Sequence, residues 1–372
     1  MSSKKVILVT GVSGYWGAKV AGRLLEDPLC RGNDDRTFGE EDVHLHVIGY
    51  DANPPKEEIK DLDFIQADIR NPKFIDLLKS EQVHTVCHLA FMETRRPNEN
   101  AFDYNVIGTM KVLGACAEAG VRKVVLMSST AVYGAQPTNP AFLTEEHPLH
   151  GSKSSGWIRD LVEIESFCNG FRRQVPEMIQ TTLRFANIIG PGVDTPMTRF
   201  LGEPFSPTLM GFDPLMQVIH VNDVVEAIAH VVHEDMPGVY NVAAEGVMPL
   251  NRITGISGKL PLPVFHLFLY WGAGLLDGKK GHYLPIALDY LRYSWVADLT
   301  KMRQELEFAP RYTAEEALRE FAGLQRLRRY MPESAALAYD EERLRDTIER
   351  RRRSRERQVG ILQGSDEEKA HE

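Results

Sequence analysis

Three glycines that follow a short apolar run constrain this chain more than any other feature of its sequence. Lys5 to Thr10 reads as a buried strand and Ala18 to Leu25 as the helix after it. A strand, a glycine-rich turn and a helix form the phosphate-binding unit of dinucleotide-binding sheets, where free amide N–H groups at the helix start hold the phosphates. The predicted phosphate-side residues are Gly11, Ser13, Gly14, Tyr15, Trp16 and Gly17.

The second strand, Val43 to Tyr50, is followed by an acidic residue, Asp51. A carboxylate at that strand tip accepts hydrogen bonds from the ribose hydroxyls of the adenosine and repels a 2′-phosphate, which favours NAD over NADP. Asp51 lies 34 residues after Gly17, more than the usual ~20. A polar insertion, Pro28 to Asp42, accounts for the excess.

Strands and helices alternate through the first half of the chain. This alternation predicts an α/β protein with a doubly wound parallel sheet, the Rossmann fold. Further strands are expected at Phe64 to Ala67, Thr85 to Leu89, Val124 to Met127 and Thr181 to Phe185, and further helices at Pro72 to Ser80 and Ala101 to Ala119.

Composition narrows the class of protein. The formal net charge of -9 argues against a nucleic-acid binder. The four cysteines, Cys30, Cys87, Cys116 and Cys168, form no CxxC pair, so we expect reduced thiols, no metal site and a cytoplasmic location. We expect residues 331–372 to form a charged helix and a disordered tail. We expect the run Arg350 to Arg353 to be solvated, with anion binding as the weaker alternative.

The longest apolar stretch, Leu260 to Leu276, contains Pro261, Pro263 and His266. It falls short of the ~20 residues needed to span a bilayer. We expect a buried helix of a second lobe here and no transmembrane segment, with attachment to a membrane surface as the weaker alternative.

The spacing TGxxGxxG resembles the extended short-chain dehydrogenase/reductases, the NAD-dependent epimerase/dehydratase family, and further segments agree over about residues 4–325. They are Ala67-Asp68-Ile69-Arg70, His88-Leu89-Ala90, Asn105-Val106-Ile107-Gly108-Thr109, Ser128-Ser129-Thr130-Ala131-Val132-Tyr133-Gly134, Leu183 to Pro191 and Val218 to Val224. The resemblance implies that cofactor contacts extend to Asp68, Ile69, Leu89, Ala90, Asn105 and Ser128. It also implies a homodimer.

The same resemblance implies a smaller α/β lobe that closes over a substrate, often a nucleotide-sugar. On this basis residues 1–184 form the NAD-binding domain, to which 214–244 return. Residues 185–213 and 245–330 form the substrate lobe.

One expected feature is missing. In the family a tyrosine and a lysine four residues later move the substrate proton, assisted by a serine, here Ser129. When the segment is aligned with the family on the following helix, Ser155 stands at the position of the tyrosine and Arg159 at the position of the lysine. A second alignment places Leu149 and Lys153 at these two positions. Serine is a poor acid or base and arginine keeps its proton. The resemblance therefore gives Ser129, Ser155 and Arg159 as the catalytic candidates, with a degenerate acid–base pair. Tyr133, Glu93, His147 and His150 are weaker substitutes.

Three functions remain open. The first is an NAD-dependent epimerase, dehydratase or reductase of a nucleotide-sugar or similar hydroxylated substrate, like UDP-glucose 4-epimerase. The second is an inactive NAD(P)-binding regulatory protein, suggested by Ser155 and Arg159. The third is a hydroxysteroid dehydrogenase-like enzyme, suggested by the apolar stretch Leu260 to Leu276.

Overall fold

The computed structural model describes residues 3–27, 43–94, 96–153, 156–203, 205–265 and 286–330. The chain divides into two compact units, residues 1–322 and residues 323–372, and the fold and sites below belong to the first. The predicted insertion at 28–42, the tail after 330 and the candidate Ser155 lie outside the described residues.

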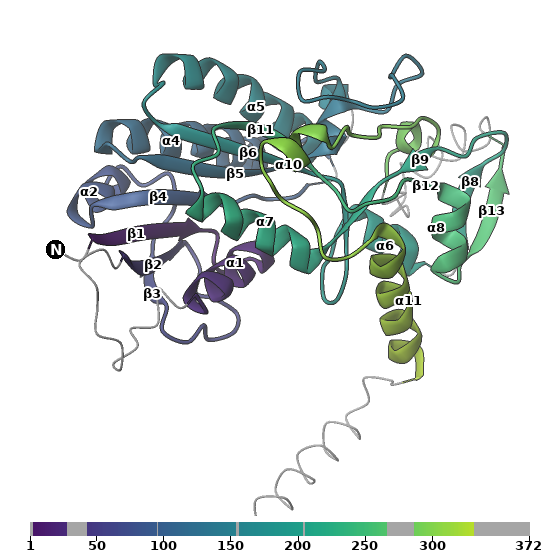
Figure 1. Cartoon of the computed structure of the whole chain (residues 1–372), viewed down its shortest axis with the longest axis horizontal. Coiled ribbons are helices and arrows are strands. Elements are labelled where there is room, and N and C mark those ends of the chain that lie inside the picture. Colours follow the sequence, from purple (N-terminus) through teal and green to yellow (C-terminus); the bar gives the residue numbers. More distant parts are fainter. Residues whose placement is uncertain are drawn as a thin grey trace, which may run out of the picture. The chain divides into compact units, whose positions relative to one another are not determined.

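Seven parallel strands form the central sheet, in the order β11-β6-β5-β4-β1-β2-β3 (Figure 1). Their bounds are β1 Ser3–Thr10, β2 Val43–Asp51, β3 Asp63–Gln66, β4 Val83–His88, β5 Lys123–Ser129, β6 Ile179–Phe185 and β11 Gly238–Val242. The predicted doubly wound Rossmann fold is confirmed, and each predicted strand is present with ends shifted by a few residues.

Helices cover both faces of this sheet, and the two-residue period of strand β1 shows how. Ile7 and Val9 belong to a core with α1 and α7, whereas Val6 and Leu8 belong to a core with α2, α4 and α5. Figure 1 shows the same division. The helix bounds are α1 Tyr15–Leu25, α2 Phe74–Ser80, α4 Gly108–Ala119, α5 Gly156–Gln174 and α7 Val221–His233.

The predicted helix Ala101 to Ala119 is interrupted. It consists of α3 (Glu99–Phe102), a π-helical turn, η1 (Asp103–Ile107), and α4. The wider turn contains Asn105, whose side chain is fully buried. π-turns inside helices often accompany functional sites.

The remaining strands and helices of the second half of the chain follow β6, and most of them contribute to a second apolar core. These are β7 Asn187–Ile189, α6 Pro196–Gly202, β8 Phe205–Leu209, β9 Leu215–Met216, β10 Val218–His220, β12 Met248–Pro249, α8 Leu250–Ile256, β13 Leu260–Val264, η4 Leu288–Leu291, α10 Thr300–Gln304 and α11 Ala314–Tyr330. They form three two-stranded sheets, β10-β7, β12-β9 and β13-β8. The remaining short helices are η2 Thr130–Tyr133 and η3 Gly151–Lys153.

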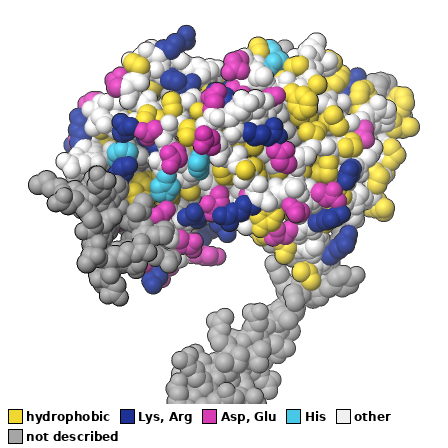
Figure 2. Space-filling model, in the orientation of Figure 1, with side chains coloured by type: hydrophobic (Ala, Val, Ile, Leu, Met, Phe, Trp, Pro, Cys, Tyr) yellow, Lys and Arg dark blue, Asp and Glu magenta, His cyan; other side chains and the backbone are white. Residues whose placement is uncertain are grey.

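The expectation of a buried helix starting at Leu260 is wrong for the part that the structure describes. Leu260–Val264 is strand β13, paired with β8, and Leu260 is 64% exposed. Pro261 and Pro263 remove two backbone donors, which a helix interior does not tolerate but an edge strand does. Figure 2 shows apolar side chains gathered over β8 and β13. Residues 266–276 lie outside the described residues.

Among the described residues, no helix combines the length and hydropathy needed to cross a bilayer.

Candidate active site

The glycine turn leaves β1 at the point where the sheet order reverses between β1 and β4. Gly11 has a φ of +80°, and a Cβ there would lie 2.7 Å from the backbone nitrogen of Ala90. A Cβ on Gly17 would lie 2.1 Å from the carbonyl oxygen of Gly11. Gly14 is the N-cap of α1, and no side chain caps this helix. Its first amide groups therefore remain available for an anion, as a pyrophosphate site requires.

Asp51 lies beside this turn despite the long insertion, because β1 and β2 pair in parallel with Thr10 opposite Tyr50. One carboxylate oxygen accepts the amide of Ser13 at 3.1 Å and the other accepts the amide of Asn53 at 3.0 Å. Each oxygen keeps a lone pair for a ribose hydroxyl. The glycine turn and Asp51 thus fit the pyrophosphate and ribose of NAD.

Asp68 follows the end of β3 by two residues, and its carboxylate is paired with Arg70, two residues further along the chain. The Arg70 guanidinium donates to its carboxylate at 2.8 and 3.0 Å, which holds the pKa of Asp68 below its usual value. Ile69 is buried and would touch a Cβ on Gly108.

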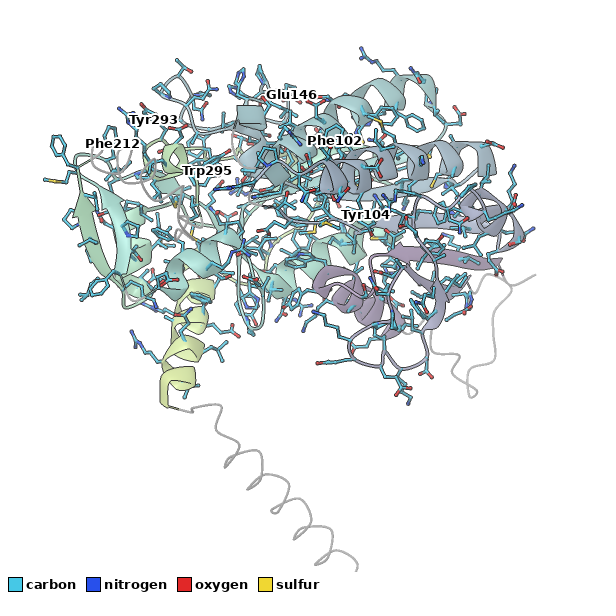
Figure 3. The ribbon with its side chains drawn as sticks, turned by 180° about the vertical axis from the view of Figure 1, so that it is seen from behind. Phe102, Tyr104, Glu146, Phe212, Tyr293 and Trp295 are labelled. Carbon is cyan, nitrogen blue, oxygen red and sulfur yellow. The ribbon has the colours of Figure 1, made fainter. Side chains whose placement is uncertain are left out.

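Tyr104 (labelled in Figure 3), which is not part of the motifs quoted above, lies close enough to Asp51 and Asp68 for their charges to act on it. Its ring lies 5.6 Å from the Arg70 guanidinium. Burial, with smaller contributions from the charges of Asp51 and Asp68, raises its pKa to about 12. Its position directly before Asn105 was the available signal.

His88 ties the glycine turn to the π-turn through buried hydroxyls. Its Nδ1 lies 2.8 Å from the Thr10 hydroxyl and its Nε2 lies 3.0 Å from the Thr109 hydroxyl. Thr109 donates its own proton to the Asn105 carbonyl at 2.5 Å, so His88 donates from Nε2 and accepts at Nδ1. Burial lowers the pKa of His88 to about 4, which keeps this neutral form.

Thr10 then donates to His88, and its oxygen accepts the amides of Leu89 and Ala90 at 3.2 and 3.3 Å. The segment after β4 is therefore anchored where it begins. Leu89 and Ala90, predicted as cofactor contacts, lie beside Gly11 and line the cavity described below.

Asn105 anchors the same segment further on. Its Oδ1 accepts the Met92 amide at 2.7 Å, and its Nδ2 donates to the Met92 carbonyl and to Asp160, both at 2.9 Å. Both amide protons are used, so the structure gives Asn105 a positioning role where the resemblance implied a cofactor contact. Sequence alone does not separate these roles.

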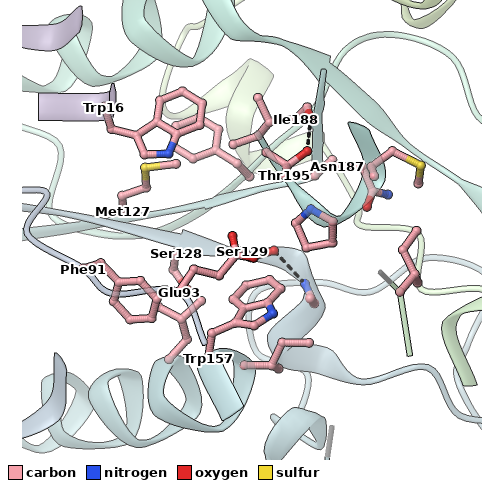
Figure 4. Close-up of a pocket in the computed structure, with 18 of the residues that line it drawn as sticks. Trp16, Phe91, Glu93, Met127, Ser128, Ser129, Trp157, Asn187, Ile188 and Thr195 are labelled. Atoms are coloured by element: carbon pink, nitrogen blue, oxygen red, sulfur yellow. Dashed lines mark hydrogen bonds between the residues drawn. The ribbon is translucent and has the colours of Figure 1, made fainter. Parts of the chain in front are cut away.

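A cavity of about 500 Å³ opens at the carboxyl edge of the sheet (Figure 4). Ser129, at the end of β5, lines it; its oxygen accepts the Ala131 amide at 3.2 Å. No acceptor for its own proton is found among the described residues. Ser128 also lines the cavity, but it donates its proton to Glu165 at 2.5 Å. Ser129 is thus the serine that can donate to a substrate oxygen.

Arg159 is not among the described residues that line this cavity. Its guanidinium donates to Asp160 at 3.1 Å and lies 5.2 Å from the Phe102 ring. The structure therefore does not bring Arg159 together with Ser129. The side chain of Lys153 lies outside the described residues, and Leu149 packs in the second core.

Tyr133 does not replace the missing tyrosine. It is fully buried; its hydroxyl donates to Asn241 and accepts from Arg184, both at 2.7 Å. Arg184 is paired with Glu165 at 2.6 Å, and both are 2% exposed. Burial raises the pKa of Tyr133 to about 12. This network is structural.

An ion-pair cluster around Arg199 lines part of the cavity. Arg199 of α6 donates to Glu93, on the segment after β4, and to Asp194 at 3.1 Å. Glu93, Asp194, Asp289, Arg96 and Arg199 are its charged lining residues among those described. No group of three or more His, Cys, Asp or Glu side chains suited to a metal ion is found among the described residues.

Solved structures with the same fold contain NAD. A dTDP-glucose 4,6-dehydratase from Bacillus anthracis in complex with NAD is 19% identical, with a TM-score of 0.62, covering 87% of this chain and 97% of that one. MoeE5 in complex with UDP-glucose and NAD is 22% identical, with a TM-score of 0.62, covering 87% and 99%.

Sequence relatives extend along most of the chain. An uncharacterized protein of Mycobacterium tuberculosis is 33% identical over 328 residues, covering 85% of this chain and 83% of its own length. A UDP-glucose 4-epimerase of Mycolicibacterium smegmatis is 28% identical over 327 residues, covering 84% and 95%.

The family is settled by the match of residues 7–243 to the model of the NAD dependent epimerase/dehydratase family. This match and the fold confirm the resemblance predicted from the motifs, and with it NAD as the cofactor. The chain belongs to the NAD dependent epimerase/dehydratase family.

Proposed function

We propose that this protein is an NAD-dependent oxidoreductase that acts on a hydroxylated substrate in the cavity beside Ser129. One observation carries the proposal: the serine with an uncommitted hydroxyl proton lies in a cavity at the sheet edge where the glycine turn also ends. Ligands of open α/β sheets bind at this switch point.

The residues divide the work by their chemistry. The first amides of α1, those of Tyr15, Trp16 and Gly17, would bind the pyrophosphate, and Asp51 would bind the adenosine ribose. Bound NAD would supply the acceptor for the hydride on the carbon of an alcohol, and the hydroxyl proton of that alcohol would be released to water. Ser129 donates a hydrogen bond to the reacting oxygen and orients it.

Two substrate classes follow from what is known of the family and the chain. The relative named UDP-glucose 4-epimerase makes nucleotide-sugars the first class to test. The second is an alcohol on a hydrocarbon skeleton, as in hydroxysteroids. In either case we expect a cytoplasmic homodimer, which cell fractionation and light scattering would check.

An NAD-binding protein without turnover is the second candidate. It is favoured by the buried position of Tyr133, because the chain has no other tyrosine until Tyr240. Without a tyrosine beside Ser129, the proton of the substrate hydroxyl must be transferred to a serine or to water, which are poorer acids and bases than a tyrosine.

The test begins with the purified protein and a search for bound nicotinamide cofactor. Absorbance at 340 nm is then followed with NAD and a panel of alcohols from both classes. Ser129→Ala should lower turnover at least tenfold, while the control Ser166→Ala, whose hydroxyl bonds within α5, should leave it unchanged. Ser155→Ala and Arg159→Ala test the two remaining catalytic candidates. Bound NAD without turnover of any alcohol would favour the second candidate function.

A further inference from the structure

The cavity beside Ser129 has two regions of different chemistry. Residues at the strand ends, such as Ala90, Met127 and Ala186, lie where the glycine turn directs the cofactor. Beyond them the walls come from α5, α6 and the segment that contains η4.

The wall beyond the strand ends is largely apolar. Its side chains include Phe91, Trp157, Met197, Ile286, Tyr290 and Trp295. The Tyr290 hydroxyl donates to the Ala131 carbonyl at 2.7 Å, and its ring packs edge-on against Trp295 at 4.7 Å. Its polar group is therefore turned to the backbone. Figure 4 shows Phe91 and Trp157 on the same side of the cavity as Ser129.

The charged side chains that line the cavity do not favour a diphosphate, and one of them, Glu93, lies beside Phe91 and Trp157 (Figure 4). Among the described lining residues, three carboxylates face two arginines. Arg199 is already paired with Glu93 and Asp194, so a phosphate would be a third anion and would compete with both carboxylates. Carboxylates a few ångströms from a phosphate repel it strongly in a site of reduced dielectric.

We propose that the substrate of this site is an uncharged alcohol on a fused-ring or similar hydrocarbon skeleton, and that nucleotide diphosphate-sugars are excluded. The inference rests on the proposed function. The hydroxyl lies at Ser129 and the skeleton lies against Trp157 and its apolar neighbours. Apolar pockets with a few placed polar groups bind ligands of this kind.

The test compares two probes on the protein saturated with NAD: 2-decalol, a bicyclic hydrocarbon alcohol, and UDP-glucose. Binding is followed by calorimetry and by the fluorescence of Trp16, Trp157 and Trp295, which all line the cavity. We expect 2-decalol to bind about tenfold more tightly than UDP-glucose, because area buried against apolar walls drives its binding. Tighter binding of UDP-glucose would overturn the proposal.

Two pairs of variants locate the effect. Trp157→Ala should weaken 2-decalol binding about tenfold and Trp157→Phe much less, because a large aromatic anchor is lost in one and kept in the other. Glu93→Gln should reduce the ratio of the dissociation constants of UDP-glucose and 2-decalol, because the variant removes a negative charge that repels the diphosphate. The matched Glu146→Gln, at an exposed position outside this cavity, should not change it. Equal losses of 2-decalol affinity in Trp157→Ala and Trp157→Phe would contradict the placement of the hydrocarbon skeleton against Trp157. An equal change of the ratio in Glu93→Gln and Glu146→Gln would contradict the role of Glu93 in excluding UDP-glucose.

The binding readout separates this inference from the proposed function. Binding of 2-decalol without formation of NADH would refute the oxidoreductase while keeping the ligand class. NADH formation with UDP-sugars alone would keep the oxidoreductase and refute the ligand class.

Discussion

The third glycine of the phosphate turn offers a sharp test of how the cofactor is held. In Gly17→Ala the new Cβ would lie 2.1 Å from the Gly11 oxygen and 2.4 Å from its carbon, both backbone atoms. Restoring an ordinary contact needs a shift of about 1 Å, and over-packing of this kind costs roughly 1–3 kcal/mol of folding stability.

The same shift misaligns the amides that bind the pyrophosphate. Hydrogen bonds to a charged group contribute about 1.5–3 kcal/mol each. Loss of two of them therefore weakens NAD binding by a factor on the order of 10² to 10⁴. Calorimetric titration with NAD measures this loss, and urea unfolding measures the change in stability.

Gly22, in the same helix, is the matched control because a Cβ there meets nothing within 4 Å. Gly22→Ala should leave NAD affinity unchanged and stabilise the protein by about 0.5–1 kcal/mol, since alanine favours helix. NAD affinity of Gly17→Ala within about threefold of the wild type would refute the reasoning, since that is under 1 kcal/mol.

Three further predictions concern charged and titrating groups. The pKa of His88 is about 4 in the folded protein, below its value of 6.5 in the unfolded chain. The contribution of His88 to the free energy of unfolding is therefore complete above pH 6.5 and decreases as the pH drops towards 4, by about 2 kcal/mol at pH 5. Between pH 7.5 and pH 5 the urea midpoint of His88→Asn should decrease less than that of the wild type. Arg184→Met leaves Glu165 buried without its partner and should cost about 3–5 kcal/mol in urea unfolding, much of which Arg184→Met combined with Glu165→Leu should recover. Asp51→Asn should weaken NAD binding about tenfold and weaken NADP binding less, because the carboxylate that repels a 2′-phosphate is gone; an unchanged ratio of the two dissociation constants would contradict the role of Asp51.

The sheet and its cofactor edge could be predicted because local patterns specify them. Apolar runs of strand length, the glycine spacing and Asp51 each act within a few residues, and parallel pairing then fixes where the strand ends meet. The insertion between Gly17 and Asp51 changes the sequence distance but not the register of β1 and β2.

The roles of polar side chains could not be predicted in this way. Asn105 and Ser128 both match family motifs, yet their partners, Met92 and Glu165, are set by packing between elements distant in sequence. The strand at Leu260 could not be predicted from the length of the apolar run, which favours a helix. The two prolines, Pro261 and Pro263, favour an edge strand instead. The cavity walls from α5, α6 and η4 have no motif, since shape rather than any fixed residue pattern defines them.

The fixing of the segment from Leu89 to Met92 at both ends has a consequence for ligand recognition. Thr10 and Asn105 hold its backbone, so the backbone of Phe91, which lies between these anchors, is fixed before any ligand arrives. Ordering a residue costs about 1–2 kcal/mol in backbone entropy, and here that loss is met during folding. A ligand's binding energy is then not spent on arranging this wall, which allows weak individual contacts to discriminate between closely related molecules.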